Sequence, residues 1–197
     1  GLEAATKIAA LGNRVGLVGR NPEKGAKAIE RIASLTRNDK LDFFQADLSL
    51  VSEIHKLSHE IKSKYSKLNV LLNNAGGASK NKVFTSEGLE KTFATNQMNY
   101  FTLTTNLMDM LSASEGSRVV NVASNAHIGT TIDFDNINAE KGYSAWKAYC
   151  VSKLMNIMFT YRLAEMQDKV TVNTLHPGFV DTNIGGNEGS VIKSIVK

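Results

Sequence analysis

The sequence contains a single cysteine and no long apolar run. The cysteine, Cys150, cannot form an internal disulfide, which argues against the disulfide-linked scaffold of a small secreted domain. No apolar run approaches the roughly 18 residues of a membrane span, so the sequence predicts no transmembrane helix. The 23 Lys and Arg residues are scattered, so the net charge of +4 does not indicate a nucleic-acid partner. A basic surface would also suit an anionic cofactor.

Length and composition are those of an ordinary globular protein. The chain has 197 residues, of which 42% are hydrophobic and 21% are charged. A chain of this length can bury a sizeable core, and no repeat, low-complexity tract or linker divides it. We therefore predict a single domain over residues 1–197.

Short apolar runs alternate with stretches of helical periodicity. Strands are predicted at 14–18, 41–45, 68–72, 118–122 and 170–175, and helices at 2–11, 22–36, 49–65, 86–112 and 144–166. The strands are short apolar runs without clean period-two alternation, which is typical of a parallel sheet covered by helices. The sequence therefore predicts an α/β fold, a Rossmann-like doubly wound parallel sheet with helices on both faces.

Polar, small or turn-forming residues follow each predicted strand. In sequence order they are Gly19 and Arg20, Asp47 and Leu48, Asn73 to Gly76, Ser124 and Asn125, and Pro177 and Gly178. Ligands of doubly wound sheets bind in the crevice beyond the carboxyl ends of the strands. We therefore expect these residues to line a binding crevice.

The segment Tyr149-Cys150-Val151-Ser152-Lys153 lies within the predicted helix 144–166. Side chains at positions i and i+4 lie on one face of a helix, so Tyr149 and Lys153 can address the same point. A free tyrosine has a pKa of about 10, and a cation beside it favours the phenolate. The pair predicts an acid–base site; the alternative is a solvated lysine beside a half-buried tyrosine.

Six segments, in this order, resemble the short-chain dehydrogenase/reductase family. They are Ala46-Asp47-Leu48, Asn73-Asn74-Ala75-Gly76, Asn96 within TFATNQMNYF, VNVAS ending at Ser124, Tyr149-x-x-x-Lys153, and His176-Pro177-Gly178-x-Val180-x-Thr182. The chain is most similar to the retinol-dehydrogenase-like branch. This rests on Ser124-x-Ala126-His127, on Ala148-Tyr149-Cys150-x-Ser152-Lys153-Leu154, and on the gap of 25 between Ser124 and Tyr149 (149 − 124).

The resemblance implies four catalytic residues. Tyr149 would be the general acid in carbonyl reduction or the base in alcohol oxidation, and Ser124 would hydrogen-bond the substrate oxygen. Lys153 would lower the pKa of Tyr149 and hold the nicotinamide ribose, and Asn96 would anchor a water that links Lys153 to solvent. In isolation, Ser124 could instead cap the end of a strand, and Asn96 could bond its own helix backbone.

The resemblance also implies a nicotinamide cofactor. Its binding residues would be Gly1, Arg20, Asp47, Leu48, Asn74, Ala75, Gly76, Tyr149, Lys153, Pro177, Gly178, Val180 and Thr182; no metal site is predicted. Because Arg20, and no acid, follows the first strand, and a guanidinium matches the 2′-phosphate, we predict NADP(H) over NAD(H). Three alternatives remain. Arg20 could be a plain surface charge, Asp47 could be a first-turn acid of the next helix, and residues 73–76 could form an ordinary turn.

The chain departs from the family at both ends. Members of the family begin with a strand and a T-G-x-x-x-G-x-G loop at a helix N-terminus, and Gly1 resembles the last glycine of that loop. A substrate-covering segment normally follows the turn at His176. We therefore expect this sequence to be the central portion of a longer protein. We expect a cytoplasmic protein, with membrane anchoring through a preceding segment as an alternative.

The leading hypothesis is an NADP(H)-dependent oxidoreductase that interconverts a carbonyl and an alcohol on a lipophilic small molecule such as a retinoid, steroid or long-chain aldehyde. A non-catalytic NADP(H)-binding scaffold or sensor is the first alternative. An epimerase or dehydratase of the related extended family is the second, against which the Asn73–Gly76 loop argues. The helices at 86–112 and 144–166 would suit a homodimer or homotetramer.

Overall fold

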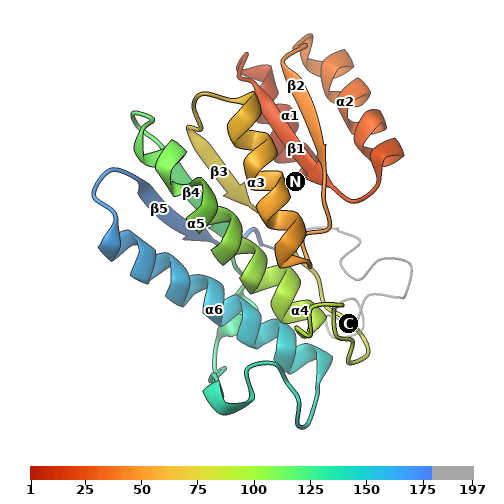
Figure 1. Cartoon of the computed structure of the whole chain (residues 1–197), viewed down its shortest axis with the longest axis vertical. Helices are drawn as coiled ribbons and strands as arrows, with labels where there is room; N and C mark the ends of the chain where they lie inside the picture. The colour runs from red at the N-terminus through yellow and green to blue at the C-terminus, as the bar shows by residue number, and fades with distance from the viewer. Residues whose placement is uncertain (179–197) are drawn as a thin grey trace. The chain divides into compact units, whose positions relative to one another are not determined.

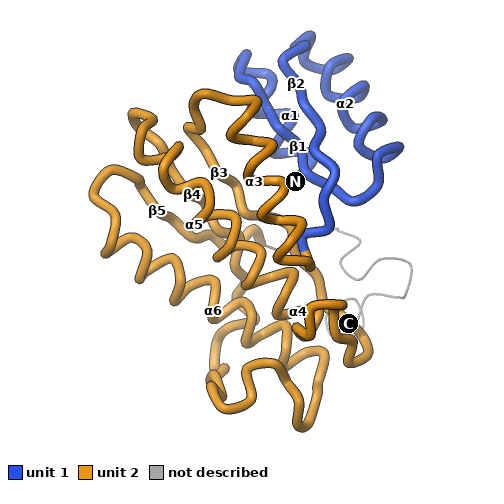
Figure 2. Tube along the Cα trace, in the orientation of Figure 1, with its two compact units in different colours: residues 1–48 blue, residues 49–197 orange. Residues whose placement is uncertain are grey.

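The chain divides into two compact units, Gly1–Leu48 and Ser49–Lys197 (Figure 2). The computed structural model describes residues 1–178, so the predictions for Val180 and Thr182 lie outside the described residues. That the whole chain forms one domain stays a prediction.

Unit 1 alternates helices and strands. Its elements are α1 (Leu2–Ala10), β1 (Val15–Gly19), α2 (Pro22–Thr36) and β2 (Leu41–Gln45) (Figure 1). The strands β1 and β2 run parallel, with Val15 opposite Leu41. The helix α2 begins where the sequence predicts, because the Asn21 side chain accepts a hydrogen bond from the backbone N–H of Lys24 and Pro22 takes the first helical position.

The core of unit 1 joins both helices to the strands. It contains Ala5 and Ala9 from α1 and Ile32 from α2, with Val15, Leu17 and Leu41 packed against them. The buried Asn38 ties the loops together, because its amide nitrogen donates to the backbone oxygens of Ala9 at 2.8 Å and Asn13 at 2.7 Å. The segments that lead into the amino ends of β1 and β2 are thereby held side by side.

Unit 2 contains a second parallel sheet. Its elements are α3 (Val51–Lys64), β3 (Val70–Asn73), α4 (Lys91–Phe93), a π-helical turn (Ala94–Met98), α5 (Asn99–Ser112), β4 (Arg118–Val122), 3₁₀ turns at Asn125–His127 and Phe134–Asn136, α6 (Ala145–Met166) and β5 (Thr171–Leu175). The strand order is β3-β4-β5, with Val70 opposite Arg118 and Arg118 opposite Thr171. Both sheets are parallel, as the sequence predicts.

A buried polar ladder joins this sheet to α5 and α6. The amide nitrogen of Asn73 on β3 donates to Thr104 on α5 and to Asn121 on β4, at 2.9 and 2.8 Å. The amide nitrogen of Asn121 donates in turn to the hydroxyl of Thr160 on α6, at 2.9 Å. Because Asn73 and Asn121 are paired in register, both helices lie against the same face of the sheet (Figure 1).

Two predicted helix starts are wrong, and in both cases a glutamate explains why. The helix predicted from residue 86 begins at Lys91, because the carboxylate of Glu90 accepts hydrogen bonds from the backbone N–H groups of Thr92 and Phe93. The helix predicted from residue 49 begins at Val51, where the distant carboxylate of Glu87 accepts from the backbone N–H groups of Val51 and Ser52 at 2.6 and 3.0 Å. Caps of this kind satisfy the orphan donors of a helix N-terminus.

No helix within residues 1–178 has both the length and the hydrophobicity that crossing a bilayer requires.

The contact between α2 and β2 predicts a stability effect at Gly25. A Cβ atom there would lie 2.5 Å from the ring of Phe43, so Gly25→Ala is expected to lower the free energy of unfolding by about 1–3 kcal/mol, measured by urea denaturation. In a Phe43→Leu background the same change should instead stabilise α2 by about 1 kcal/mol, because alanine is the better helix former. Equal effects in the two backgrounds would contradict the overpacking.

Candidate active site

One face of α6 is polar and buried. Tyr149, Ser152, Lys153, Asn156 and Thr160 are all buried, and their spacing of three or four residues brings them onto one side of the helix. The helix begins after Ser144, whose hydroxyl accepts from the backbone N–H of Lys147, at the predicted place. Side chains from three other elements meet this face.

The phenol of Tyr149 lies in a desolvating environment. Its ring stacks on that of Trp146, with centroids 6.0 Å apart. Burial raises the pKa of Tyr149, and a hydrogen bond with the Ser124 side chain opposes the rise without cancelling it. This direction is opposite to the lowering by Lys153 that the sequence predicts. The spacing brings the two residues onto one face of the helix, but burial is the largest influence on the pKa of the phenol.

Lys153 is buried, with 4% of its surface exposed, so the alternative of a solvated lysine is wrong. Its ammonium nitrogen donates to the backbone oxygen of Val122 on β4 at 2.8 Å and to Oδ1 of Asn156 at 3.3 Å. The same nitrogen lies 5.6 Å from the ring centroid of Tyr100 and 5.8 Å from that of Tyr149. Burial lowers the pKa of Lys153 to about 8.

Asn96 lies in the π-helical turn and is fully buried. Its amide oxygen accepts from the backbone N–H of Gly77 at 2.8 Å, while its amide nitrogen donates to the backbone oxygen of Gly77 and to the hydroxyl of Ser152, at 2.9 and 2.8 Å. The side chain therefore connects the loop after β3 to α6, and the alternative in which it bonds its own helix is wrong. π-helical turns of this kind are frequent at functional sites.

The loop after β3 approaches these side chains closely. A Cβ atom at Gly76 would lie 3.1 Å from Oδ1 of Asn96 and 3.5 Å from Nζ of Lys153, whereas one at Gly77 would meet open space. Glycine at position 76 therefore permits a contact that a side chain would disturb, so the loop is more than an ordinary turn. Asn74 and Gly76 are exposed and Ala75 is half-buried, so this loop is accessible to a ligand.

Ser124 caps a turn and also faces the phenol. Its hydroxyl accepts from the backbone N–H of Ala126 at 3.2 Å, as the capping alternative proposes, and the same side chain hydrogen-bonds Tyr149. The ring of His176 accepts from the neighbouring backbone N–H of Asn125 at 3.3 Å. This bond brings the turn of Pro177 and Gly178 to the end of β4, beside the catalytic candidates.

The predicted cofactor residues of unit 1 lie at the carboxyl ends of its strands. Arg20 follows β1, 66% of its side chain is exposed, and its guanidinium lies 3.8 Å from the carboxylate of Asp47. Asp47, next to the half-buried Leu48, precedes the first residue of α3, and the first-turn acid of that helix is Glu53. The first-turn alternative for Asp47 is therefore wrong. Gly1 is exposed and caps the first turn of α1.

Four residues that the sequence analysis did not identify hold the catalytic candidates in place. They are Gly77, Gln97, Ser152 and Asn156. A signal for two of them was present, because polar residues recur at 149, 152, 153, 156 and 160 along an otherwise largely apolar helix. Such a repeat on a helix that packs against a sheet predicts buried polar contacts.

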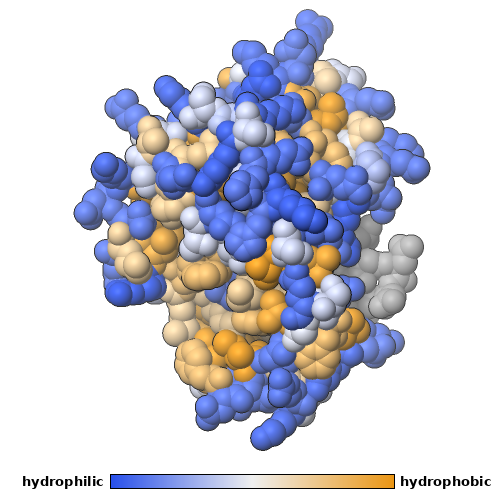
Figure 3. Space-filling model, viewed as in Figure 1, coloured by the Kyte–Doolittle hydropathy of each residue, from blue (hydrophilic) through white to orange (hydrophobic). Residues whose placement is uncertain are grey.

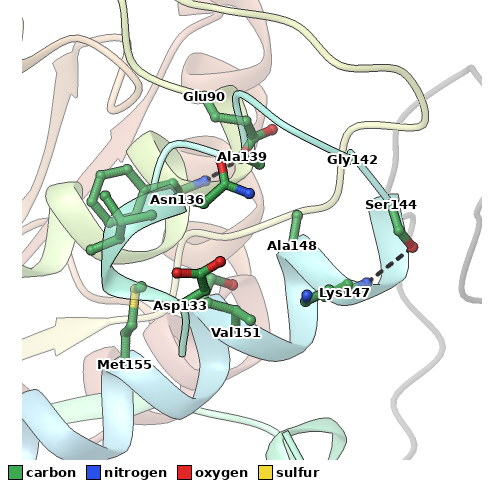
Figure 4. Close-up of a pocket in the computed structure, with 13 residues that line it drawn as sticks. Glu90, Asp133, Asn136, Ala139, Gly142, Ser144, Lys147, Ala148, Val151 and Met155 are labelled. Carbon is green, nitrogen blue, oxygen red and sulfur yellow. Dashed lines mark hydrogen bonds between the residues drawn. The ribbon is translucent and has the colours of Figure 1, made fainter. Parts of the chain in front are cut away.

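A pocket lies beside the first half of α6 (Figure 4). It has about 530 Å³ of empty space, part of it open to solvent, between α4, the 133–142 segment and α6. From α6 it is lined by Lys147, Ala148, Val151, Ser152 and Met155, and neither Tyr149 nor Lys153 is among the lining residues. The pocket therefore meets the polar cluster of α6 at Ser152, whose hydroxyl accepts from Asn96.

Comparisons with known proteins agree with the geometry. The sequence model of the family described as short chain dehydrogenase matches residues 1–191. Human retinol dehydrogenase 13 is 34% identical over 192 residues, covering 96% of this chain and 58% of that protein. Human retinol dehydrogenase 11 is 37% identical over 186 residues, covering 93% of this chain and 58% of that protein. The chain thus spans less than two thirds of the length of either relative.

Solved structures share the fold. An uncharacterised protein of Mycobacterium paratuberculosis superposes with a TM-score of 0.79 at 30% identity, over 93% of this chain and 66% of that one. A short chain dehydrogenase of Shigella flexneri in complex with NADP superposes with a TM-score of 0.70 at 26% identity, over 89% of this chain and 70% of that one. These likenesses confirm the predicted Rossmann-like fold. Together with the family match, they show that the chain belongs to the short-chain dehydrogenase family of oxidoreductases, in its retinol-dehydrogenase-like branch.

Proposed function

We propose that the protein is an NADP(H)-dependent oxidoreductase that interconverts a carbonyl and an alcohol, with Tyr149 as its acid–base group. The observation that carries this proposal is the cluster at α6. There a buried phenol is hydrogen-bonded to Ser124, and a buried ammonium, that of Lys153, lies on the same helix face. Phenol, hydroxyl and ammonium are the groups that carbonyl reduction requires at one place.

The residues of the chain have distinct roles in this mechanism. Bound nicotinamide would supply the hydride. As the carbonyl carbon gains a C–H bond, its oxygen becomes an alkoxide, and Tyr149 gives it the phenolic proton. The Ser124 hydroxyl donates a hydrogen bond to the same oxygen where the charge develops. Since burial raises the pKa of Tyr149, the phenol keeps its proton at neutral pH and can donate it to the alkoxide.

The proposed cofactor is NADP(H). In unit 2 the exposed Gly76 lies beside Asn96 and Lys153, and this glycine and the exposed Asn74 would hold the nicotinamide end. In unit 1 the exposed guanidinium of Arg20 lies 3.8 Å from the carboxylate of Asp47, and a long surface ion pair of this kind costs little to exchange for the 2′-phosphate of NADP(H). Complexes of related short chain dehydrogenases with NADP from Shigella flexneri and with NADPH from Escherichia coli support this preference.

The proposed substrate is a lipophilic alcohol or its aldehyde or ketone. Human retinol dehydrogenases 11 and 13 and human polyprenol dehydrogenase, which is 33% identical over 192 residues, are named for apolar alcohols. The aromatic ring of Trp146, stacked on Tyr149, offers apolar surface beside the phenol. Both observations support a substrate with a long or bulky apolar part.

The proposed assembly is a homodimer or homotetramer packed through helices. In Figure 3, apolar surface gathers over α5 and α6. Phe101 on α5 and Met158 and Tyr161 on α6 are exposed, and Phe101 packs edge-on against the ring of Phe159, with centroids 5.7 Å apart. Burying these side chains against a second copy is favourable. The cytoplasmic location expected from the sequence stays a prediction.

Replacing the phenolic hydroxyl tests the reaction. NADPH is titrated into the protein, followed by its fluorescence, and lipophilic aldehydes are then added. Tyr149→Phe is expected to bind NADPH as the unchanged protein does, but to oxidise it at least about 10²- to 10⁴-fold more slowly, because the proton donor is lost. A Tyr149→Phe protein with an undiminished rate would contradict the acid–base role. Binding by the unchanged protein without any oxidation would favour the scaffold or sensor.

Charge reversal at Arg20 tests the cofactor preference. Arg20→Glu is expected to weaken NADPH binding about 10- to 100-fold relative to NADH, since a charge-assisted hydrogen bond to the 2′-phosphate is replaced by repulsion. Arg14→Glu is the matched control, because Arg14 precedes β1 and is paired with Asp42 at 3.1 Å, at the end of the strand away from Gly19. An unchanged NADPH-to-NADH ratio in Arg20→Glu would remove Arg20 from the phosphate site.

A further inference from the structure

A fully buried amide, Asn156, bridges Lys153 and the turn that carries Asn96. Its Oδ1 accepts a hydrogen bond from Nζ of Lys153 at 3.3 Å. Its Nδ2 donates to the backbone oxygen of Asn96 at 2.9 Å and to Oε1 of Gln97 at 3.0 Å. One side chain thus joins the ammonium on α6 to the π-helical turn 60 residues earlier in the sequence.

The surroundings of Asn156 determine which way the amide points. Lys153 can only donate hydrogen bonds, and the Asn96 carbonyl can only accept them. The amide must therefore turn its oxygen to the ammonium and its nitrogen to the turn. Among natural side chains of this size only asparagine offers an acceptor and a donor in these two directions. Aspartate keeps the acceptor, and leucine keeps neither.

Neutral oxygens hold the charge on Lys153. The strand β4 presents the backbone oxygen of Val122, and Asn156 presents its amide oxygen. The titratable groups that face the ammonium are Tyr149 from its own helix and Tyr100 from α5, and the loop after β3 presents only Gly76. The contacts described for this ammonium include no carboxylate. Because burial alone disfavours the charged form, each neutral acceptor matters for keeping it protonated.

We propose that Asn156 is a positioning residue that holds the Lys153 ammonium and the Asn96–Gln97 turn as one unit. The catalytic consequence rests on the function proposed above, in which the Lys153 ammonium is one of the groups gathered at the reacting carbonyl. The amide does so in two ways, since its oxygen favours the charged lysine and its nitrogen fixes the distance between α6 and the turn. Gln97 is half-buried, so the bridge also leads from the buried ammonium toward the surface.

Comparison with Thr160 distinguishes this positioning role of Asn156 from a purely structural role. Thr160 is buried one turn further along α6, where its hydroxyl donates to the backbone oxygen of Asn156 at 2.7 Å and accepts from Asn121. Its described hydrogen bonds do not involve Lys153. Thr160→Val therefore removes a buried polar contact from the same helix and leaves the ammonium with both of its acceptors.

The direct test is a titration of Lys153 by NMR in protein labelled at the lysine side chains, with the signal assigned from Lys153→Arg. Burial lowers the pKa of Lys153 to about 8 in the unchanged protein. Asn156→Leu is expected to lower the midpoint by about one pH unit, because the charged form loses an acceptor. Asn156→Asp is expected to raise it, because the acceptor becomes an anion. Thr160→Val is expected to leave it unchanged.

The titration does not depend on turnover, so it separates this inference from the proposed function. An unchanged midpoint in both Asn156 variants would overturn the inference, even in a protein that reduces aldehydes. If Asn156→Leu does not fold, the upward shift in Asn156→Asp carries the test alone. Shifted midpoints in a protein that reduces no carbonyl would support the role of Asn156 and refute the proposed reductase function.

Kinetics supply the second readout in a protein that turns over. In Asn156→Leu the alkaline limb of kcat should move to lower pH, because the ammonium is lost earlier, and kcat should fall about 5-fold at pH 8 with little change in KM for the aldehyde. In Asn156→Asp the limb should move to higher pH. Thr160→Val should lower Tm while the pH profile stays in place. A shift of the same size in Thr160→Val would reduce Asn156 to a structural residue.

Discussion

The three hydrogen bonds of the Asn96 side chain hold unit 2 together at its polar centre. Two of them go to the backbone of Gly77 and one goes to Ser152, so the loop after β3, the π-helical turn and α6 are fixed to one another by a single amide. The position of the loop beside α6 depends on this arrangement. The approach of Gly76 to Asn96 and Lys153 exists only because the loop is drawn onto the turn. A buried amide left without partners costs about 1–3 kcal/mol, so the geometry is strongly specified.

The polar face of α6 continues this arrangement through the sheet. Asn156 bonds the turn, Thr160 bonds Asn156 and receives a bond from Asn121, and Asn121 accepts one from Asn73 on the neighbouring strand. A network of this kind is stabilising only when each member is satisfied, and these members are. It places the ammonium of Lys153 among neutral acceptors, and the helix cannot rotate or slide without breaking several bonds at once.

Local signals predicted local structure well. The helix Pro22–Thr36 agrees with its predicted bounds, because Asn21 and Pro22 are adjacent in sequence to the turn they start. The starts of α3 and α4 differ from the prediction. The helix α3 is capped by Glu87, which lies 36 positions after Val51. The residues before α4 form an isolated antiparallel β-bridge between Phe84 and Glu90, so the helix cannot begin before Glu90. The site residues also differ in how far away in the sequence their partners lie. Tyr149, Lys153, Ser124 and Asn96 are carried by short motifs, whereas Ser152 and Asn156 act on partners 56 and 60 residues away.

The same distinction explains why the predicted pKa shift of Tyr149 has the wrong direction. A spacing of four residues puts two side chains on one helix face, but it does not determine what the ends of those side chains touch. Here the lysine ammonium is satisfied by Val122 and Asn156, while the phenol is governed by its burial and by Ser124. Burial raises the pKa of Tyr149, so the phenol keeps its proton at neutral pH. Burial lowers the pKa of Lys153 to about 8, which still leaves the ammonium charged at neutral pH. A protonated phenol is the form that can donate to an alkoxide, and the neutral oxygens around Lys153 keep the ammonium charged where burial alone would favour its neutral form.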